Sequence, residues 1–268
     1  MLLAIDIGNT HTVIGLFEGE DISATWRMGT PKYSYETEDE VGAIIINFIS
    51  NAGYNLLNVE EIAISSVVPR ATEEFRKMSL KYFKHEPFII GSESKTGIKV
   101  LYDYPKEVGA DRLANSVAVK EFYGCPAIVA DFGTATTFDI ISSDCSYIGG
   151  VIVPGIEISS EALFKFAAKL SKVDLSWPSG IIGKNTYDGL RSGILYGFLG
   201  QVDFIIEKII EEEKGSKKAF DPHIIATGGL SYLLKDKSKY IKIFDEDLTL
   251  KGIRLIYEQN KVEKRDEC

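Results

Sequence analysis

A short motif, Asp-x-Gly followed by a polar residue, occurs twice in this chain. The first copy is Asp6-Ile7-Gly8-Asn9-Thr10 and the second is Asp131-Phe132-Gly133-Thr134-Ala135. Each copy lies between two runs rich in β-branched and aromatic residues, a pattern that predicts a turn joining two strands. Repetition of a whole unit in this way predicts two similar α/β domains facing each other across a cleft.

The two halves are predicted to share one order of elements, three strands followed by helices that alternate with two more strands. In the first half, we expect strands over 2–7, 10–19, 21–28, 61–69 and 87–91, and helices over 36–52 and 70–83. In the second half, we expect strands over 125–133, 135–143, 146–155, 221–229 and 240–245, and helices within 156–214 and over 247–260. The expected domains are 1–115 and 116–268.

The first acid-glycine turn has the composition of an anion-binding loop. Gly8 permits close approach of a bulky group to the backbone, and Asn9 and Thr10 add side-chain donors to the backbone N–H groups. Asp6 cannot favourably contact a phosphate, but a carboxylate beside such a loop can hold Mg²⁺, often through water. A single copy is equally consistent with an ordinary hairpin turn, and the second copy favours the phosphate-binding interpretation. The sequence has no P-loop and no GxGxxG motif.

A second candidate site lies between the two halves, where a helix is expected to begin near Gly109 or Ala110. Asp111 and Arg112 would then lie in the first turn of that helix. One interpretation is a capping aspartate followed by an exposed arginine. The functional interpretation is a general base, Asp111, beside an anion-binding Arg112. In the second half, the glycines of 227–230 could pack against a flat ligand such as adenosine, although paired glycines are common in loops.

Composition and charge exclude several classes of function. The net charge of −9 and pI near 5.0 argue against a general nucleic-acid binder. Three cysteines without a CxxC pair argue against a disulfide framework and for a reducing compartment, with Cys125 as a small buried residue. Three scattered histidines offer little material for zinc. Because we find neither a signal peptide nor a run of apolar residues long enough to span a membrane, we expect a cytoplasmic protein without membrane partners.

The motifs together resemble one known family. The blocks DIGNT, GADR, DFGTATT, YIGG with the following PG, IGKNT and TGG occur in the order and spacing found in type III pantothenate kinases, of the acetate and sugar kinase/Hsp70/actin superfamily. The resemblance covers nearly the whole chain. It implies two ribonuclease H-like (actin-like ATPase) domains and ATP-dependent phosphorylation of pantothenate to 4′-phosphopantothenate, the first step of coenzyme A biosynthesis.

The resemblance also implies roles for individual residues. Asp111 is similar to the family's general base, Asp131 to its monovalent-cation ligand (K⁺ or NH₄⁺), and Asp6 to a residue that positions Mg²⁺ through water. The positions that match ATP contacts are Asp6, Ile7, Gly8, Asn9, Thr10, His11, Thr12, Val13 and Thr134. The positions that match pantothenate contacts are Tyr102, Gly109, Ala110, Asp111, Arg112 and Thr186. Members of the family are homodimers, so a homodimer is expected.

Three alternatives remain open at this point. A related kinase could act on another small alcohol or carboxylate, although Tyr102 and the GADR block argue against this. A non-catalytic nucleotide switch would bind ATP without rapid turnover, and the presence of Asp111 argues against it. A transcriptional accessory role has been attached to some relatives, but the charge of −9 makes direct DNA binding improbable.

Overall fold

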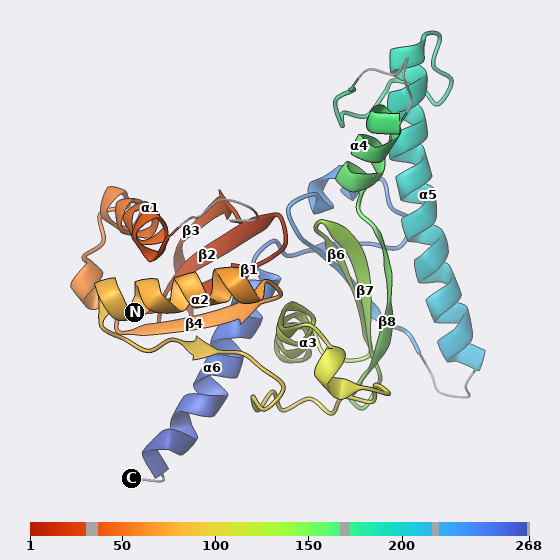
Figure 1. Cartoon of the computed structure of the whole chain (residues 1–268). Coiled ribbons are helices and arrows are strands. Elements are labelled where there is room, and N and C mark those ends of the chain that lie inside the picture. Colours follow the sequence, from red (N-terminus) through yellow and green to blue (C-terminus); the bar gives the residue numbers. More distant parts are fainter. Residues whose placement is uncertain (31–36, 167–171, 216–219, 267–268) are drawn as a thin grey trace. The chain divides into compact units, whose positions relative to one another are not determined.

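The computed structural model describes residues 1–30, 37–166, 172–215 and 220–266 (Figure 1). The chain forms two compact units, and each has its own five-stranded mixed sheet with helices. The first unit consists of Met1–Ile98, Tyr102–Glu121 and Asp247–Cys268, and the second of Lys99–Leu101 and Phe122–Glu246. This division differs from a simple cut between 115 and 116, because the last helix belongs to the first unit.

The first sheet has the order β3-β2-β1-β4-β5. Its strands are β1 (Leu2–Ile7), β2 (His11–Glu18), β3 (Asp21–Gly29), β4 (Glu61–Ser66) and β5 (Phe88–Ile89). The pairs β1–β2 and β2–β3 are antiparallel, whereas β1–β4 and β4–β5 are parallel. A central strand therefore has a hairpin on one side and parallel crossovers on the other.

The second sheet repeats this arrangement, read in the order β8-β7-β6-β9-β10. Its strands are β6 (Ala127–Phe132), β7 (Ala135–Ile141), β8 (Tyr147–Pro154), β9 (His223–Thr227) and β10 (Ile243–Phe244). Again the pairs on the hairpin side are antiparallel and those on the crossover side are parallel. The predicted duplicated α/β fold is confirmed, strand for strand.

Two helices cover one face of the first sheet, α1 (Glu38–Asn51) and α2 (Pro69–Met78). A short π-helical segment, η2 (Ser79–Phe83), continues α2, so the expected helix over 70–83 changes type near its end. The buried cluster joins alternate residues of β1 to apolar positions of both helices, and its members include Leu3, Ile5, Ile7, Val41, Ile45, Ile49, Phe75 and Met78. Because side chains alternate along a strand, Asp6 points to the opposite face of the sheet.

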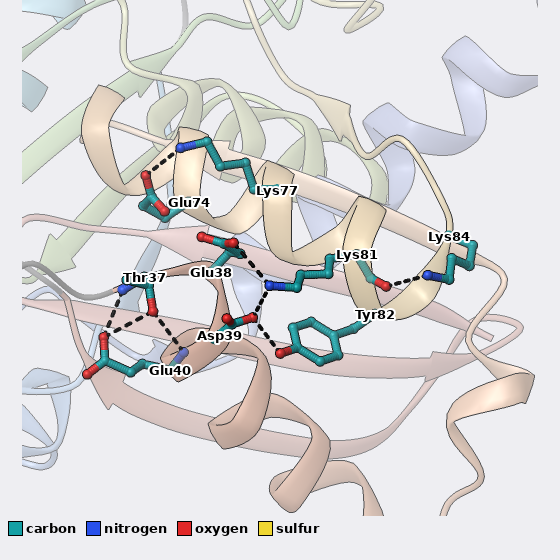
Figure 2. Close-up of polar contacts among 9 residues, drawn as sticks. All are labelled: Thr37, Glu38, Asp39, Glu40, Glu74, Lys77, Lys81, Tyr82 and Lys84. Carbon is teal, nitrogen blue, oxygen red and sulfur yellow. Dashed lines mark hydrogen bonds and ion pairs between the residues drawn. The ribbon is translucent and has the colours of Figure 1, made fainter.

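Polar contacts hold α1 against the α2–η2 segment (Figure 2). Thr37 and Glu40 form a reciprocal capping box at the start of α1, with the Thr37 N–H donating to Glu40 Oε2 at 2.8 Å. Lys81 bridges Glu38 at 3.2 Å and Asp39 at 2.5 Å, and the Tyr82 hydroxyl also donates to Asp39 at 2.6 Å. These pairs are exposed, so their role is to fix the register of the two helices more than to add stability.

The last helix, α6 (Leu248–Asp266), packs within the first unit against α3 (Ala110–Phe122). A Cβ at Gly252 would overlap the backbone of Ala114, so the two helices can approach this closely only with glycine at that position. The Thr249 hydroxyl also donates to Asn115 Oδ1 at 2.8 Å. These contacts fix the helix that carries Asp111.

The second unit has a long helix, α5 (Thr186–Gly215), whose buried face covers one side of the second sheet. Phe132 of β6 meets Phe198 of α5 edge to face, with ring centroids 5.8 Å apart. The shorter α4 (Ile156–Phe166) lies beside α5 (Figure 1). In the described part of the expected helical region 156–214, α4 and α5 are therefore separate helices, and residues 172–185 before α5 are not helical. In the parts of the chain that the structure describes, no helix combines the length and apolarity of a membrane span.

The structure overturns one expectation about the cysteines. Cys125 and Cys145 form a disulfide with their Cα atoms 5.5 Å apart, and Cys125 is partly rather than fully buried. Cys125 precedes β6, and Cys145 lies in the β7–β8 hairpin. The antiparallel pairing of β6 with β7 returns the hairpin to the start of β6, a proximity that spacing in the sequence does not reveal. Cysteine usage therefore no longer argues for a reducing compartment.

Candidate functional site

The first acid-glycine loop joins β1 to β2 in the first unit. The Gly8 N–H donates to the His11 carbonyl at 3.1 Å, which closes a tight turn, and Asn9 and His11 are exposed at its tip. Ile7 lies in the core, and the buried Thr12 hydroxyl lies 3.0 Å from that of Thr30. Ile7 and Thr12 can therefore present only backbone groups to a ligand, whereas Asn9, partly buried Thr10 and His11 can present side chains.

The Asp6 carboxylate at the start of this loop has a defined orientation. The Ser65 hydroxyl on the neighbouring strand β4 donates to Asp6 Oδ1 at 3.0 Å, and the two residues are register partners. A carboxylate oriented in this way, beside a turn with exposed donors, fits a magnesium ion bound through water. Sequence reasoning missed Ser65, because only the parallel β1–β4 pairing brings it to Asp6.

The GADR block lies at the same edge of the first unit. The Val67 N–H donates to the Ile7 carbonyl at 3.1 Å, and a Cβ on Gly109 would lie 3.7 Å from the Val67 side chain. Gly109 also lies directly against Asp111 Oδ1. The structure therefore brings together the first loop and the GADR block, which are about a hundred residues apart in the sequence.

Asp111 is partly buried in the first turn of α3. The Arg112 N–H donates to Asp111 Oδ1 at 2.8 Å. Burial raises the pKa of Asp111 above its ordinary value, against the opposing effects of that hydrogen bond and of the Arg112 charge. The result is a positioned carboxylate with a raised pKa, which is what a general base requires. Arg112 itself is only 9% exposed, so it is not the exposed arginine of the capping interpretation.

The second acid-glycine loop is also closed by a hydrogen bond from its glycine, but it is one residue shorter than the first. The Gly133 N–H donates to the carbonyl of Ala135, two residues on, at 3.1 Å, whereas the Gly8 N–H donates to the carbonyl of His11, three residues on. The Thr134 carbonyl accepts from the Gly155 N–H at 3.1 Å. Asp131 points away from the α5 side of the sheet, because its neighbour Phe132 faces α5. The two halves of the repeat thus share a strand order, while their acid-glycine turns differ in length by one residue.

The glycines after β9 form one wall beside Asp131. Gly228 has φ of +85°, a conformation that L side chains rarely adopt, and a Cβ there would lie 2.5 Å from Asp131 Oδ1. The Asp131 carboxylate therefore lies against the backbone at Gly228. A carboxylate in this position has the oxygen donors that a hard cation prefers. In the described ranges there is no cluster of three or more His, Cys, Asp or Glu residues that could hold a metal on its own.

Two further predicted substrate contacts belong to different units. Tyr102 is partly buried in the first unit, before the short helix η3 (Pro105–Glu107). Thr186 is exposed at the first position of α5 in the second unit, where the Asn185 side chain caps the helix by accepting from the Asp188 N–H at 2.9 Å. The ordered start of α5 gives the Thr186 side chain a defined position within its own unit.

Solved structures with the same fold carry diverse functions. A Campylobacter jejuni protein described as a Baf family transcriptional activator is 19% identical, with a TM-score of 0.58, over 97% of this chain and 98% of its own. Component A of (R)-2-hydroxyglutaryl-CoA dehydratase from Acidaminococcus fermentans is 12% identical, with a TM-score of 0.55, over 97% and 98%. MreB 5 of Spiroplasma citri, bound to AMPPNP, is 9% identical, with a TM-score of 0.55, over 100% and 98%. These similarities show that the chain has the same fold as these proteins, with α/β domains of the ribonuclease H-like (actin-like) type.

The sequence itself gives a more specific match. A model of the type III pantothenate kinase family matches residues 2–208, which include both acid-glycine loops, the GADR block and Thr186.

Proposed function

The chain belongs to the type III pantothenate kinase family, and we propose that it transfers the γ-phosphoryl group of ATP to the 4′-hydroxyl of pantothenate. The observation that carries this proposal is the position of Asp111. It lies at the edge of the first unit where the Asp6 loop also lies, held by the Arg112 N–H and by close contact with Gly109. The product, 4′-phosphopantothenate, would enter coenzyme A biosynthesis.

In the proposed reaction, Asp111 accepts the proton of the pantothenate hydroxyl. The hydroxyl oxygen forms a bond to the γ-phosphorus while the bond from that phosphorus to the β–γ bridging oxygen breaks, and ADP leaves. The raised pKa of Asp111 makes the carboxylate a stronger proton acceptor than an ordinary aspartate. A positioned base of this kind contributes about 10²–10⁴-fold to such a reaction.

The two loops are proposed to bind the phosphates of ATP. In the first unit, backbone N–H groups and the side chains of Asn9, Thr10 and His11 would contact ATP, and Thr134 would do so in the second unit. Mg²⁺ near Asp6 and a potassium or ammonium ion near Asp131 would supply charge neutralisation when bound. Asp6 would orient the first ion from a carboxylate that Ser65 fixes.

The pantothenate contacts follow from the same motifs. Tyr102, Gly109, Ala110 and Thr186 are proposed to bind the substrate. Arg112 would bind either the pantothenate carboxylate or the transferring phosphoryl group, and both roles suit a guanidinium that the fold holds mostly buried.

A homodimer is proposed on the basis of exposed apolar side chains in the second unit. Ile182 is 85% exposed and Phe166 is 82% exposed, and Ile158 and Leu163 of α4 are also exposed. Large apolar side chains in contact with water favour association with a partner surface. Replacing Ile182 with Asp should shift the protein towards the monomer in light scattering. A cytoplasmic location is proposed from the metabolic role alone.

The test of function is ADP release from Mg-ATP, measured with and without pantothenate in potassium and in sodium buffer. We expect release to require both pantothenate and potassium. If ADP release requires pantothenate but is equal in both buffers, the proposed kinase activity stands and the proposed potassium site at Asp131 is wrong. Protein that binds ATP but releases no ADP on adding pantothenate would contradict the proposed function.

A further inference from the structure

A row of oxygen-bearing side chains crosses the second sheet at the end of β6. Asp131 pairs with Thr227 on the parallel strand β9 and with Thr137 on the antiparallel strand β7. Residues in direct register on neighbouring strands project from the same face of a sheet. The three side chains therefore share one face, while Phe132, the next residue, points to the α5 side.

The Thr227 side chain is the unusual member of this row. It is 1% exposed, and its hydroxyl has no hydrogen-bond partner. Burying a hydroxyl without a partner costs free energy, so buried hydroxyls are nearly always satisfied by protein, water or a bound ion. Since this hydroxyl shares a face with the neighbouring Asp131, the missing partner belongs next to the carboxylate.

The backbone after Thr227 lies close to the Asp131 carboxylate. Gly228 lies so close to Asp131 that a Cβ would be 2.5 Å from Oδ1 and 2.7 Å from the Phe132 backbone. The carboxylate is therefore held beside the Thr227–Gly228 segment.

We infer that the Thr227 hydroxyl is a direct ligand of a monovalent cation shared with Asp131. All the donors are hard oxygens, which excludes a soft metal. One carboxylate with neutral hydroxyls balances a single positive charge, whereas a dehydrated divalent ion would need further carboxylates. This inference rests on the proposed cation at Asp131 and adds Thr227 to the ligands of that cation. The sequence had indicated the segment 227–230 only as a possible contact for adenosine.

The test compares two threonines that differ in the face they occupy. Thr227→Val removes the hydroxyl and keeps the shape of the side chain. Thr136→Val is the matched control, because Thr136 is also fully buried with an unpartnered hydroxyl, but it pairs with Phe132 and so lies on the other face. Thr227→Ser keeps the hydroxyl and should keep binding.

Binding is measured on the protein alone by Tl⁺ NMR, with Tl⁺ as the probe for K⁺, and by the rise in melting temperature in KCl relative to choline chloride. We expect the apparent affinity for both ions to fall at least tenfold in Thr227→Val and to stay within twofold in Thr136→Val and Thr227→Ser. If Thr227→Val fails to fold, loss of binding in Thr227→Ala beside retention in Thr227→Ser decides the matter. Unchanged binding in the folded Thr227 variant, equal losses in both valine variants, or no specific binding to the unaltered protein would each overturn the inference.

These outcomes are separate from those of the proposed function, because no ATP or pantothenate is present. Loss of ion binding in Thr227→Val together with absence of pantothenate-dependent ADP release would leave the ion site standing and refute the kinase proposal. If Thr227→Val shows the same potassium-dependent turnover as the unaltered enzyme, the proposed kinase activity stands and the proposed role of Thr227 is wrong.

Discussion

The Ser65 hydroxyl donates to Asp6 Oδ1 at 3.0 Å and so ties β4 to the carboxylate that begins the first loop. The two residues are register partners in a parallel pair of strands, and both lie on the face opposite α1 and α2. Ser65 is fully buried, so water cannot replace its hydrogen bond easily. We infer that Ser65 positions Asp6 for its proposed role.

Replacing Ser65 with Ala should lower kcat/KM for Mg-ATP by about tenfold or more. A hydrogen bond to a charged group contributes about 1.5–3 kcal/mol, and without it the Asp6 carboxylate gains rotational freedom. The loss should shrink when Mg²⁺ is raised, which a purely structural defect would not show. Ser50→Ala, on the exposed side of α1, is the control and should leave kinetics unchanged. A Ser65→Ala enzyme with unaltered kinetics at low Mg²⁺ would contradict the positioning role.

Replacing Asp111 with Asn should reduce kcat by about 10²–10⁴-fold, because the amide cannot accept the hydroxyl proton. ATP binding, measured by calorimetry, should be nearly unchanged, because the proposed phosphate contacts lie in the two loops. In the unaltered enzyme, the acid limb of kcat should lie above the pH range of an ordinary aspartate, since burial raises the pKa of Asp111. Full turnover by the Asn variant would show that another group accepts the proton.

The same substitution should make the protein more stable at neutral pH. The folded-state pKa of Asp111 is raised, so the folded protein binds more protons than the unfolded chain between the two pKa values. The stability that the protonated carboxyl gives is therefore present below the unfolded pKa and is lost as pH rises through the folded pKa. Asp111→Asn should raise the melting temperature at pH 7 and have little effect near pH 3. An equal effect at both pH values would contradict a raised pKa.

Replacing Gly252 with Ala should destabilise the first unit by about 1–3 kcal/mol or more, since the new methyl group would overlap the Ala114 backbone and force α3 and α6 apart. Because α3 carries Asp111, kcat should fall as well. Gly200 is the matched control: it is also helical, in α5, but a Cβ there meets no atom within 4 Å. Gly200→Ala should stabilise by about 0.5–1 kcal/mol. Denaturant unfolding of both variants measures the difference, and equal changes would contradict the close approach of α3 and α6.

The disulfide between Cys125 and Cys145 can be tested by counting the thiols that react with a thiol reagent. Denatured, non-reduced protein should show one reactive thiol per chain, and reduced protein should show three. Because the bridge closes a loop between residues separated by 20 positions, Cys145→Ser should lower the free energy of unfolding by about 3 kcal/mol. Cys268→Ser, outside the pair, should have no such effect. Three thiols in protein purified without reductant would show that the pair is not oxidised in solution.

The sequence by itself was sufficient to predict the duplicated α/β fold, because Asp-x-Gly turns and alternating apolar residues report local conformation. It also led to the family, because the motifs between Asp6 and Thr186 keep their order and spacing whatever the packing. The order of the elements along the chain followed from the same repeat, whereas the order of the strands within each sheet comes from the structure.

Only the tertiary structure decided which residues meet. Ser65 hydrogen-bonds to Asp6, and Thr227 lies next to Asp131, through parallel pairing between strands far apart in the sequence. The spacing along the chain carries no record of that register. Cys125 and Cys145 meet because a hairpin folds back. The last helix, α6, packs against β1 and β4 of the first sheet and, at Gly252, against Ala114 of α3. Local propensity is fixed by neighbouring residues, whereas these contacts depend on the whole sheet, so they appear only once the chain has folded.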